Sequence, residues 1–228
     1  MRSRTQPELL RRIRQLVAEE AAANPVSYNT SQPYQSYERI GLAGRRWSVE
    51  KRVAEYGIDQ LCHPDRHVLD IGSHCGFLTV ECALRCKLAH GVEPTPLLNR
   101  VGLLAAEYLG VADRVAFFDC RFEDFEPAMR YDLVLSLAAF HTFDGRERTA
   151  AQAYFSKIER LLAPGGQVVY ESTSYAKDAG VADYDPASIR ASQEALEAIR
   201  QHFRVVKVWE TTSGSAAWFR QFAIAQKR

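Results

Sequence analysis

The chain has 228 residues, of which 46% are hydrophobic and 25% are charged, a composition typical of a globular protein with one hydrophobic core. Its net charge of +1 argues against a surface built throughout to hold nucleic acid or anionic lipid. No apolar run approaches the roughly 20 residues of a membrane span, and no signal-peptide core follows the basic start. We therefore expect a soluble, cytoplasmic protein without a membrane span.

The N-terminal segment predicts an amphipathic helix. Between Arg2 and Leu16 there are five arginines and a single acid, Glu8. Apolar residues recur there at helical spacing: Leu9, Leu10, Ile13, Leu16 and Val17. We interpret the helix as docking through its apolar face with its arginines in solvent, and contact with RNA or a membrane surface is the alternative. An irregular connector, Pro25 to Tyr37, follows it.

Downstream, short apolar runs alternate with segments of helical periodicity. Ser48 is expected to cap a helix that ends at Gly57, and Thr95 and Pro96 to supply a cap and a first-turn proline for another. The expected strands are 67–71, 88–92, 115–118, 133–137 and 167–171, with helices at 76–86, 95–110 and 150–162. Such alternation predicts a parallel sheet. Two further alternating runs, 205–211 and 218–225, predict an antiparallel hairpin.

The five cysteines include no CxxC pair, so they are interpreted as reduced thiols and no metal site is predicted. Cys82 and Cys86 share a helix face and could bind a metal with His74. The interpretation as small buried apolar residues is preferred.

A glycine-containing loop follows the first expected strand in the sequence VLDIGSHCG, residues 68–76. It lacks the middle glycine of a GxGxxG dinucleotide loop, and Asp70 just before it would repel a phosphate but suits an ammonium group. Glu93 ends the next strand, where an acid can accept both hydroxyls of a ribose.

Together with GVEP, YDLVLSL and LLAPGG, this loop resembles the class I S-adenosylmethionine (SAM) dependent methyltransferases from Arg66 to Gln226. The resemblance implies an α/β fold: a doubly wound, seven-stranded, mostly parallel Rossmann-like sheet with a C-terminal antiparallel hairpin. It implies SAM as cofactor, with S-adenosylhomocysteine (SAH) as product. The expected domains are 1–57, a helical extension that covers the site, and 58–228, which binds SAM.

The resemblance also implies the cofactor-binding residues. Asp70, Gly72, Ser73 and Gly76 would hold the methionine half and Glu93 the ribose. Arg121 stands where the family has an acid, so the Phe122 backbone and the Glu123 side chain are expected to contact adenine. The remaining cofactor-binding residues of the prediction are Pro94, Ser136 and Leu137.

Upstream, Gly44 to Trp47, followed by Arg52, Tyr56 and Gly57, resembles the entry segment of the tRNA wobble-uridine carboxymethyltransferase family, which uses carboxy-SAM, and the sequence GVEPTPLL strengthens this resemblance. That family has a tyrosine before the histidine that follows the fourth strand. Here the pair is Phe140 and His141, and phenylalanine cannot donate a hydrogen bond to the extra carboxylate, so ordinary SAM is favoured.

His141 is the candidate general base, with a pocket-lining imidazole as the alternative. The expected substrate residues are Arg46, Trp47, Phe140, Tyr170, Glu171 and Tyr175. For Arg46 and Trp47 the alternative is a solvated charged turn, and for Tyr170 and Glu171 it is a simple strand end. The inserted segment from Thr173 to Pro186 favours transfer to an O or N atom of a small-molecule or glycan acceptor. An RNA methyltransferase and a non-catalytic SAM-binding module remain as alternatives, and the sequence does not indicate the oligomeric state.

Overall fold

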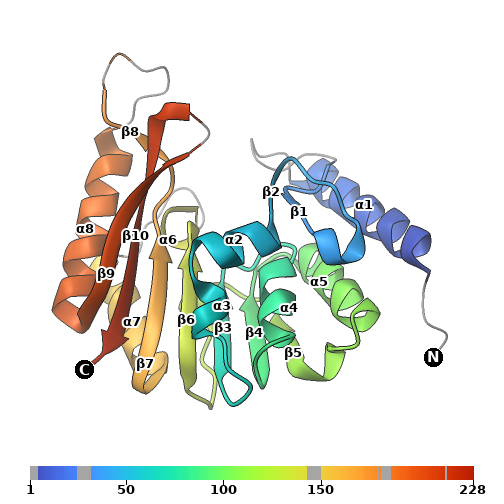
Figure 1. Cartoon of the computed structure of the whole chain (residues 1–228), viewed down its shortest axis with the longest axis horizontal. Helices are drawn as coiled ribbons and strands as arrows, with labels where there is room; N and C mark the ends of the chain where they lie inside the picture. Colours follow the sequence, from blue (N-terminus) through green and yellow to red (C-terminus); the bar gives the residue numbers. More distant parts are fainter. Residues whose placement is uncertain (1–4, 25–31, 143–149, 179, 181–185, 214) are drawn as a thin grey trace. The chain divides into compact units, whose positions relative to one another are not determined.

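The computed structural model describes residues 5–24, 32–142, 150–178, 180, 186–213 and 215–228, and it leaves out the side chains of 141, 142, 213, 215 and 216. The chain falls into two compact units, residues 1–126 and 127–228. Helices and parallel strands alternate in both units (Figure 1), which agrees with the expected α/β class. The expected domain boundary at residue 57 stays a prediction.

The first unit is built on three parallel strands in the order β5-β4-β3. These strands are β3 (His67–Ile71), β4 (Leu88–Val92) and β5 (Val115–Phe118). The connecting helices are α4 (Phe77–Ala83) and α5 (Pro96–Tyr108), and η2 (Ala112–Arg114) precedes β5. In register, Ile71 lies beside Val92 and Val92 beside Phe118, so the three strands end at one edge. A ligand site is expected at that edge of a parallel sheet.

Helix α1 (Gln6–Ala23) packs along α5 (Figure 1). It buries Leu9, Ile13, Leu16 and Val17, which confirms the predicted apolar face. Contact with α5 therefore stabilises α1 through apolar burial on one side, while Arg11 and Arg14 stay exposed.

Short elements connect α1 to the sheet. They are β1 (Gln35–Ser36), η1 (Glu38–Ile40), β2 (Arg46–Ser48), α2 (Val49–Glu55) and α3 (Ile58–Leu61). Ser48 caps α2 as predicted, because its hydroxyl accepts the Lys51 N–H at 3.3 Å. The buried carboxylate of Glu81 on α4 anchors this segment through Tyr37 and Arg39.

The second unit contains parallel β6 (Tyr131–Leu137) and β7 (Leu162–Glu171), with β10 (Ser215–Lys227) antiparallel to β7 and paired on its other side with β9 (Phe203–Ser213). The predicted hairpin is thus confirmed. Its helices are α6 (Ala139–Thr142), α7 (Ala151–Leu161) and α8 (Pro186–His202), and a short β8 (Tyr175–Ala176) joins β10.

The structure differs from the prediction in several details, among them β1, which lies inside the segment expected to be irregular, a helix cap and a helix. Pro96 begins α5 as predicted, but the Thr95 side chain makes no capping hydrogen bond. Helix α8 was not predicted, because its buried face consists largely of small residues, among them Ala191, Ala195 and Ala198. Alanine contributes a weak hydrophobic periodicity even though it favours helix.

Candidate functional site

The glycine loop is fixed to the neighbouring strand by its backbone. The N–H groups of Gly72 and Ser73 both donate to the Val92 carbonyl, at 2.9 and 3.1 Å. The Glu93 N–H donates in turn to the Phe118 carbonyl at 3.2 Å. The predicted methionine and ribose positions therefore meet at the carboxyl ends of adjacent strands β3 and β4.

Glu93 is held in one orientation by two backbone donors. Its Oε2 accepts the His74 N–H at 3.2 Å and its Oε1 accepts the Thr95 N–H at 3.1 Å. Burial raises the pKa of Glu93 above its usual value, those two donors lower it, and the charge of Glu20 raises it. Each carboxylate oxygen has a second lone-pair direction, so the group can still accept hydroxyl donors.

The loop needs glycine at two of its predicted positions. Gly72 and Gly76 both have φ of 68°, a left-handed conformation that glycine adopts without strain. A Cβ on Gly76 would also lie 2.4 Å from the ring of Phe117. Ser73 between them is buried, and its hydroxyl has no hydrogen-bond partner among the described residues. An unpartnered buried hydroxyl fits a loop that binds a polar ligand.

His74 lies inside the loop with φ of 50°, unusual for a residue other than glycine. Burial lowers the pKa of His74 to about 4, so its imidazole is neutral at neutral pH. Its ring meets that of Tyr34 edge to face at 5.9 Å, and the Arg46 guanidinium lies 5.9 Å from the Tyr34 ring. This contact brings the predicted substrate residue Arg46 to the neighbourhood of the glycine loop. Trp47 is 50% exposed.

Asp70 is buried on β3, where its Oδ2 accepts the Thr79 hydroxyl at 2.7 Å. Burial raises the pKa of Asp70 from 3.8 to about 6, although the bond from Thr79 and the charge of Arg52 oppose the shift. A buried carboxylate favours a cation such as the ammonium group that the resemblance implies.

Replacing Asp70 by Asn is expected to stabilise the ligand-free protein at about pH 8 by up to about 3 kcal/mol. The stability linked to protonation of Asp70 is fully present below its unfolded pKa of 3.8 and is lost as the pH rises through about 6. Asn keeps an oxygen for Thr79 without the charge. Urea unfolding at about pH 8 and about pH 3.5 should show a gain only at the higher pH. A gain of equal size at both values, or the same gain in Asp59→Asn at an exposed position, would contradict this explanation.

The predicted adenine residues lie in η3 (Phe122–Asp124), after β5. The Phe122 side chain is buried, and Glu123 is exposed, as is Pro94 after β4. Their contacts with a cofactor stay predictions.

In the second unit, Ser136 is fully buried and shares a hydrogen bond with the Tyr154 hydroxyl at 2.9 Å, and Leu137 is half-buried. Ala138 then has φ of 58°, and its N–H donates to the Glu171 carbonyl at 2.9 Å. A left-handed alanine is strained, and such strain is common in functional loops. The backbone of His141 lies in α6, but its side chain is outside the described part.

The other predicted substrate residues of this unit are largely buried. Phe140 packs against the Tyr154 ring at 5.0 Å, and Tyr170 against Phe155 at 5.6 Å. The Glu171 carboxylate, also fully buried, pairs with Arg220 at 2.5 Å. Tyr170 and Glu171 thus have the surroundings of core residues, and their substrate role stays a prediction without support from burial.

Tyr175 is 6% exposed, and its hydroxyl donates to Oε2 of Glu210 at 2.6 Å. Lys177 binds the other oxygen of that carboxylate at 2.5 Å. This network fixes the orientation of the Tyr175 ring.

Three polar residues near the site were missed by the sequence analysis. Asn99 on α5 donates to the Glu93 carbonyl at 2.8 Å and to Asp119 at 2.7 Å, while its own Oδ1 is buried without a partner among the described residues. Glu20 on α1 is buried, and its charge acts on Glu93. Both Glu20 and Asp119 have a signal in the sequence. Glu20 lies on the same helix face as Ile13, which indicates burial, and Asp119 directly follows an expected strand, where site residues gather.

Comparison with known proteins finds methyltransferases similar to the central part of the chain. Residues 68–166 match the family described as "Methyltransferase domain". An uncharacterized methyltransferase of Bacillus velezensis is 34% identical over 96 residues, which are 41% of this chain and 43% of that protein. The malonyl-[acyl-carrier protein] O-methyltransferase of Anoxybacillus flavithermus is 27% identical over 141 residues, which are 59% of this chain and 49% of that protein. The match thus spans less than half of the length of these curated relatives.

Among solved structures, the N-methyltransferase NodS from Bradyrhizobium japonicum, in complex with SAH, is similar with a TM-score of 0.64 and 16% identity. The similarity covers 95% of this chain and 98% of that one. It confirms the Rossmann-like fold. The match of residues 68–166 to a methyltransferase-domain family confirms the predicted resemblance to the class I SAM-dependent methyltransferases and implies SAM as the cofactor.

Proposed function

We propose that the protein transfers a methyl group from SAM to an oxygen or nitrogen atom of a small-molecule or glycan acceptor. The observation that carries this proposal is the juxtaposition of the glycine loop with the Glu93 carboxylate, which two backbone N–H groups hold at the end of β4. The unpartnered hydroxyl of Ser73 supports it, because the loop offers a polar group for a ligand to satisfy.

In this proposal, the residues of the first unit bind the cofactor. Asp70 and Ser73, with the backbone at Gly72 and Gly76, hold the methionine half, and Glu93 accepts the ribose hydroxyls. Pro94, Phe122 and Glu123 contact the adenine, and Ser136 and Leu137 are proposed as further cofactor-binding residues. Bound SAM supplies an electrophilic methyl group, whose displacement depends mainly on alignment of the acceptor.

The acceptor side is assigned to Arg46, Trp47, Phe140 and Tyr175, with His141 as the general base. The related proteins include an O-methyltransferase and an N-methyltransferase, and both atom types are compatible with this assignment. In the described part of the chain, no helix has the length and apolar character needed to cross a bilayer.

An RNA acceptor is the second candidate. The exposed Trp47 favours it, because an exposed aromatic ring beside a cation can stack on an unpaired base. The Lys51 ammonium lies 4.0 Å from the centroid of the Trp47 ring. Incubation with methyl-labelled SAM and separate small-metabolite and RNA fractions distinguishes the two by the fraction that gains label. Label in RNA, with retention that falls steeply as salt rises, would replace the small-molecule proposal. No label in either would favour a non-catalytic module.

Glu93→Ala is expected to weaken SAH binding by about 1 to 3 kcal/mol, because the change removes charge-assisted acceptors for two hydroxyls. Isothermal titration calorimetry on wild type and variant measures the difference. Glu55→Ala, at an exposed acid of α2, is the matched control and should bind SAH as wild type does. An unchanged affinity in Glu93→Ala removes this residue from the site, and binding of NAD without SAH would overturn the cofactor assignment.

A further inference from the structure

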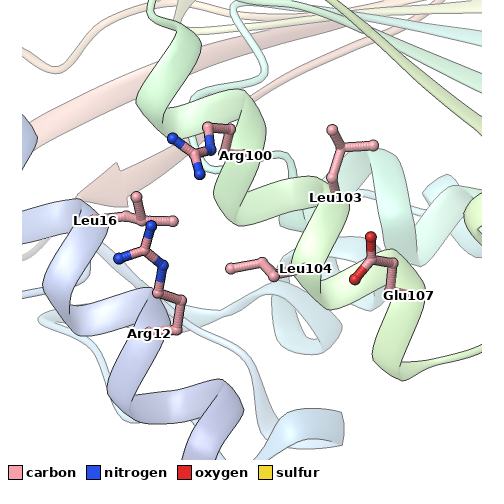
Figure 2. Close-up of a pocket in the computed structure, with 6 residues that line it drawn as sticks. All are labelled: Arg12, Leu16, Arg100, Leu103, Leu104 and Glu107. Atoms are coloured by element: carbon pink, nitrogen blue, oxygen red, sulfur yellow. The ribbon is translucent and has the colours of Figure 1, made fainter. Parts of the chain in front are cut away.

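An open groove runs between α1 and α5 in the first unit. It has a volume of about 310 Å³, and its lining residues are Arg12, Leu16, Arg100, Leu103, Leu104 and Glu107 (Figure 2). Leu103 and Leu104 of α5 form an apolar floor, whereas Leu16 of α1 is fully buried. None of the six residues belongs to the cofactor or acceptor site proposed above, so the groove has no assigned function.

The two arginines of the groove are not neutralised within the described part of the chain. Arg12 and Arg100 reach from facing helices toward the same end of the groove, near Leu16 (Figure 2). Neither guanidinium has an ion pair or hydrogen bond with another described residue. The Glu107 carboxylate lies farther along α5. The surface is therefore cationic at one end and apolar in the middle.

The apolar floor is accessible to a partner. Leu103 is 39% exposed and is one of the few large apolar side chains of the described surface that are so exposed. Leu104 beside it is half-buried. An exposed leucine next to unpaired arginines combines the two features of an interface, a small apolar centre and a charged rim.

We propose that this groove binds an acidic amphipathic helix of a partner protein. Carboxylates of such a helix pair with Arg12 and Arg100, and its leucine-like residues, at i, i+3 and i+4, pack on Leu103 and Leu104. Charge complementarity selects an acidic partner. RNA fits the groove less well, because none of its lining residues has an aromatic ring on which a base could stack. The proposal does not depend on the reaction that the protein performs.

The experiment is a selection from displayed helical peptides of about 18 residues, long enough for about five turns. Leucine is fixed at one helical stripe, and the other positions vary among Glu, Lys, Gln and Ser. The full-length chain should enrich Glu-rich sequences. A labelled peptide from the selection is then titrated, with fluorescence anisotropy as the readout.

The Arg12→Gln/Arg100→Gln variant should bind that peptide at least about tenfold more weakly, and Leu103→Ser several-fold more weakly. Arg190→Gln, at an exposed arginine of α8, is the control and should bind as wild type does. Thermal unfolding verifies that each variant is folded, and SAH affinity should stay unchanged in all of them.

Three results would overturn the proposal. The first is no enrichment of acidic over basic peptides. The second is equal weakening by the Arg190 control. The third is a different occupant of the groove. This would be shown by an unstructured RNA oligonucleotide that binds through Arg12 and Arg100 more tightly than the peptide does. It would also be shown by sedimentation velocity that finds a dimer of this chain and its dissociation in Leu103→Ser.

Discussion

Replacing Glu81 by Ala is expected to lower the free energy of unfolding by about 3 to 5 kcal/mol. The Glu81 carboxylate has no exposed surface and accepts from the Arg39 Nε at 2.8 Å, the Arg85 guanidinium at 2.5 Å and the Tyr37 hydroxyl at 3.0 Å. The variant leaves the buried Tyr37 hydroxyl without its acceptor and places two cations beside a cavity. Urea denaturation measures the loss.

The same network gives a pH dependence. Burial raises the pKa of Glu81, but hydrogen bonds from Arg39 and Arg85 outweigh it and hold the pKa below its usual value of 4.5. The stability contributed by the network is therefore present above about pH 4.5 and is lost as the pH falls through the lowered pKa. Glu19→Ala on the exposed face of α1 is the control and should change stability by less than about 0.5 kcal/mol. A loss below about 1 kcal/mol for Glu81→Ala would show that the cluster is solvated.

The longer strands of the sheet and the helices α5 and α7 were predictable because their signals are local. Runs such as His67–Ile71 are apolar, short and followed by glycine, and the structure places β3 over the same residues. The segment before β2 was not predicted, because Gln35 and Ser36 form β1 only through pairing with residues 46 and 48. Local propensity contains no information on such a contact.

The candidate site was predictable only where its residues follow strands. Glu93 and the glycine loop were found because a parallel sheet brings successive strand ends together. Asn99 and Glu20 were missed because each comes from a helix whose docking decides which side chains reach the site. The burial of Glu171 depends on Arg220, a residue of β10 that only the folded hairpin brings close.

His141→Ala is expected to lower turnover by about 100-fold or more while leaving SAH affinity within a factor of about three. The structure places the backbone of His141 in α6, three residues beyond the left-handed Ala138, whose N–H is held by the Glu171 carbonyl. The imidazole itself lies outside the described residues, so the role of general base is a prediction. Single-turnover kinetics with the acceptor found by methyl labelling measures the loss, and His63→Ala, at an exposed histidine, is the control.

The pH dependence of this variant separates a base from a residue that lines the pocket. If His141 removes a proton, the loss in His141→Ala should shrink at high pH for an acidic acceptor, since such an acceptor ionises without help. For an acceptor with a high pKa the loss should persist over the accessible range. A loss that is equally large at every pH and accompanied by a raised KM instead indicates that the imidazole positions the acceptor, and unchanged turnover would leave catalysis to alignment alone.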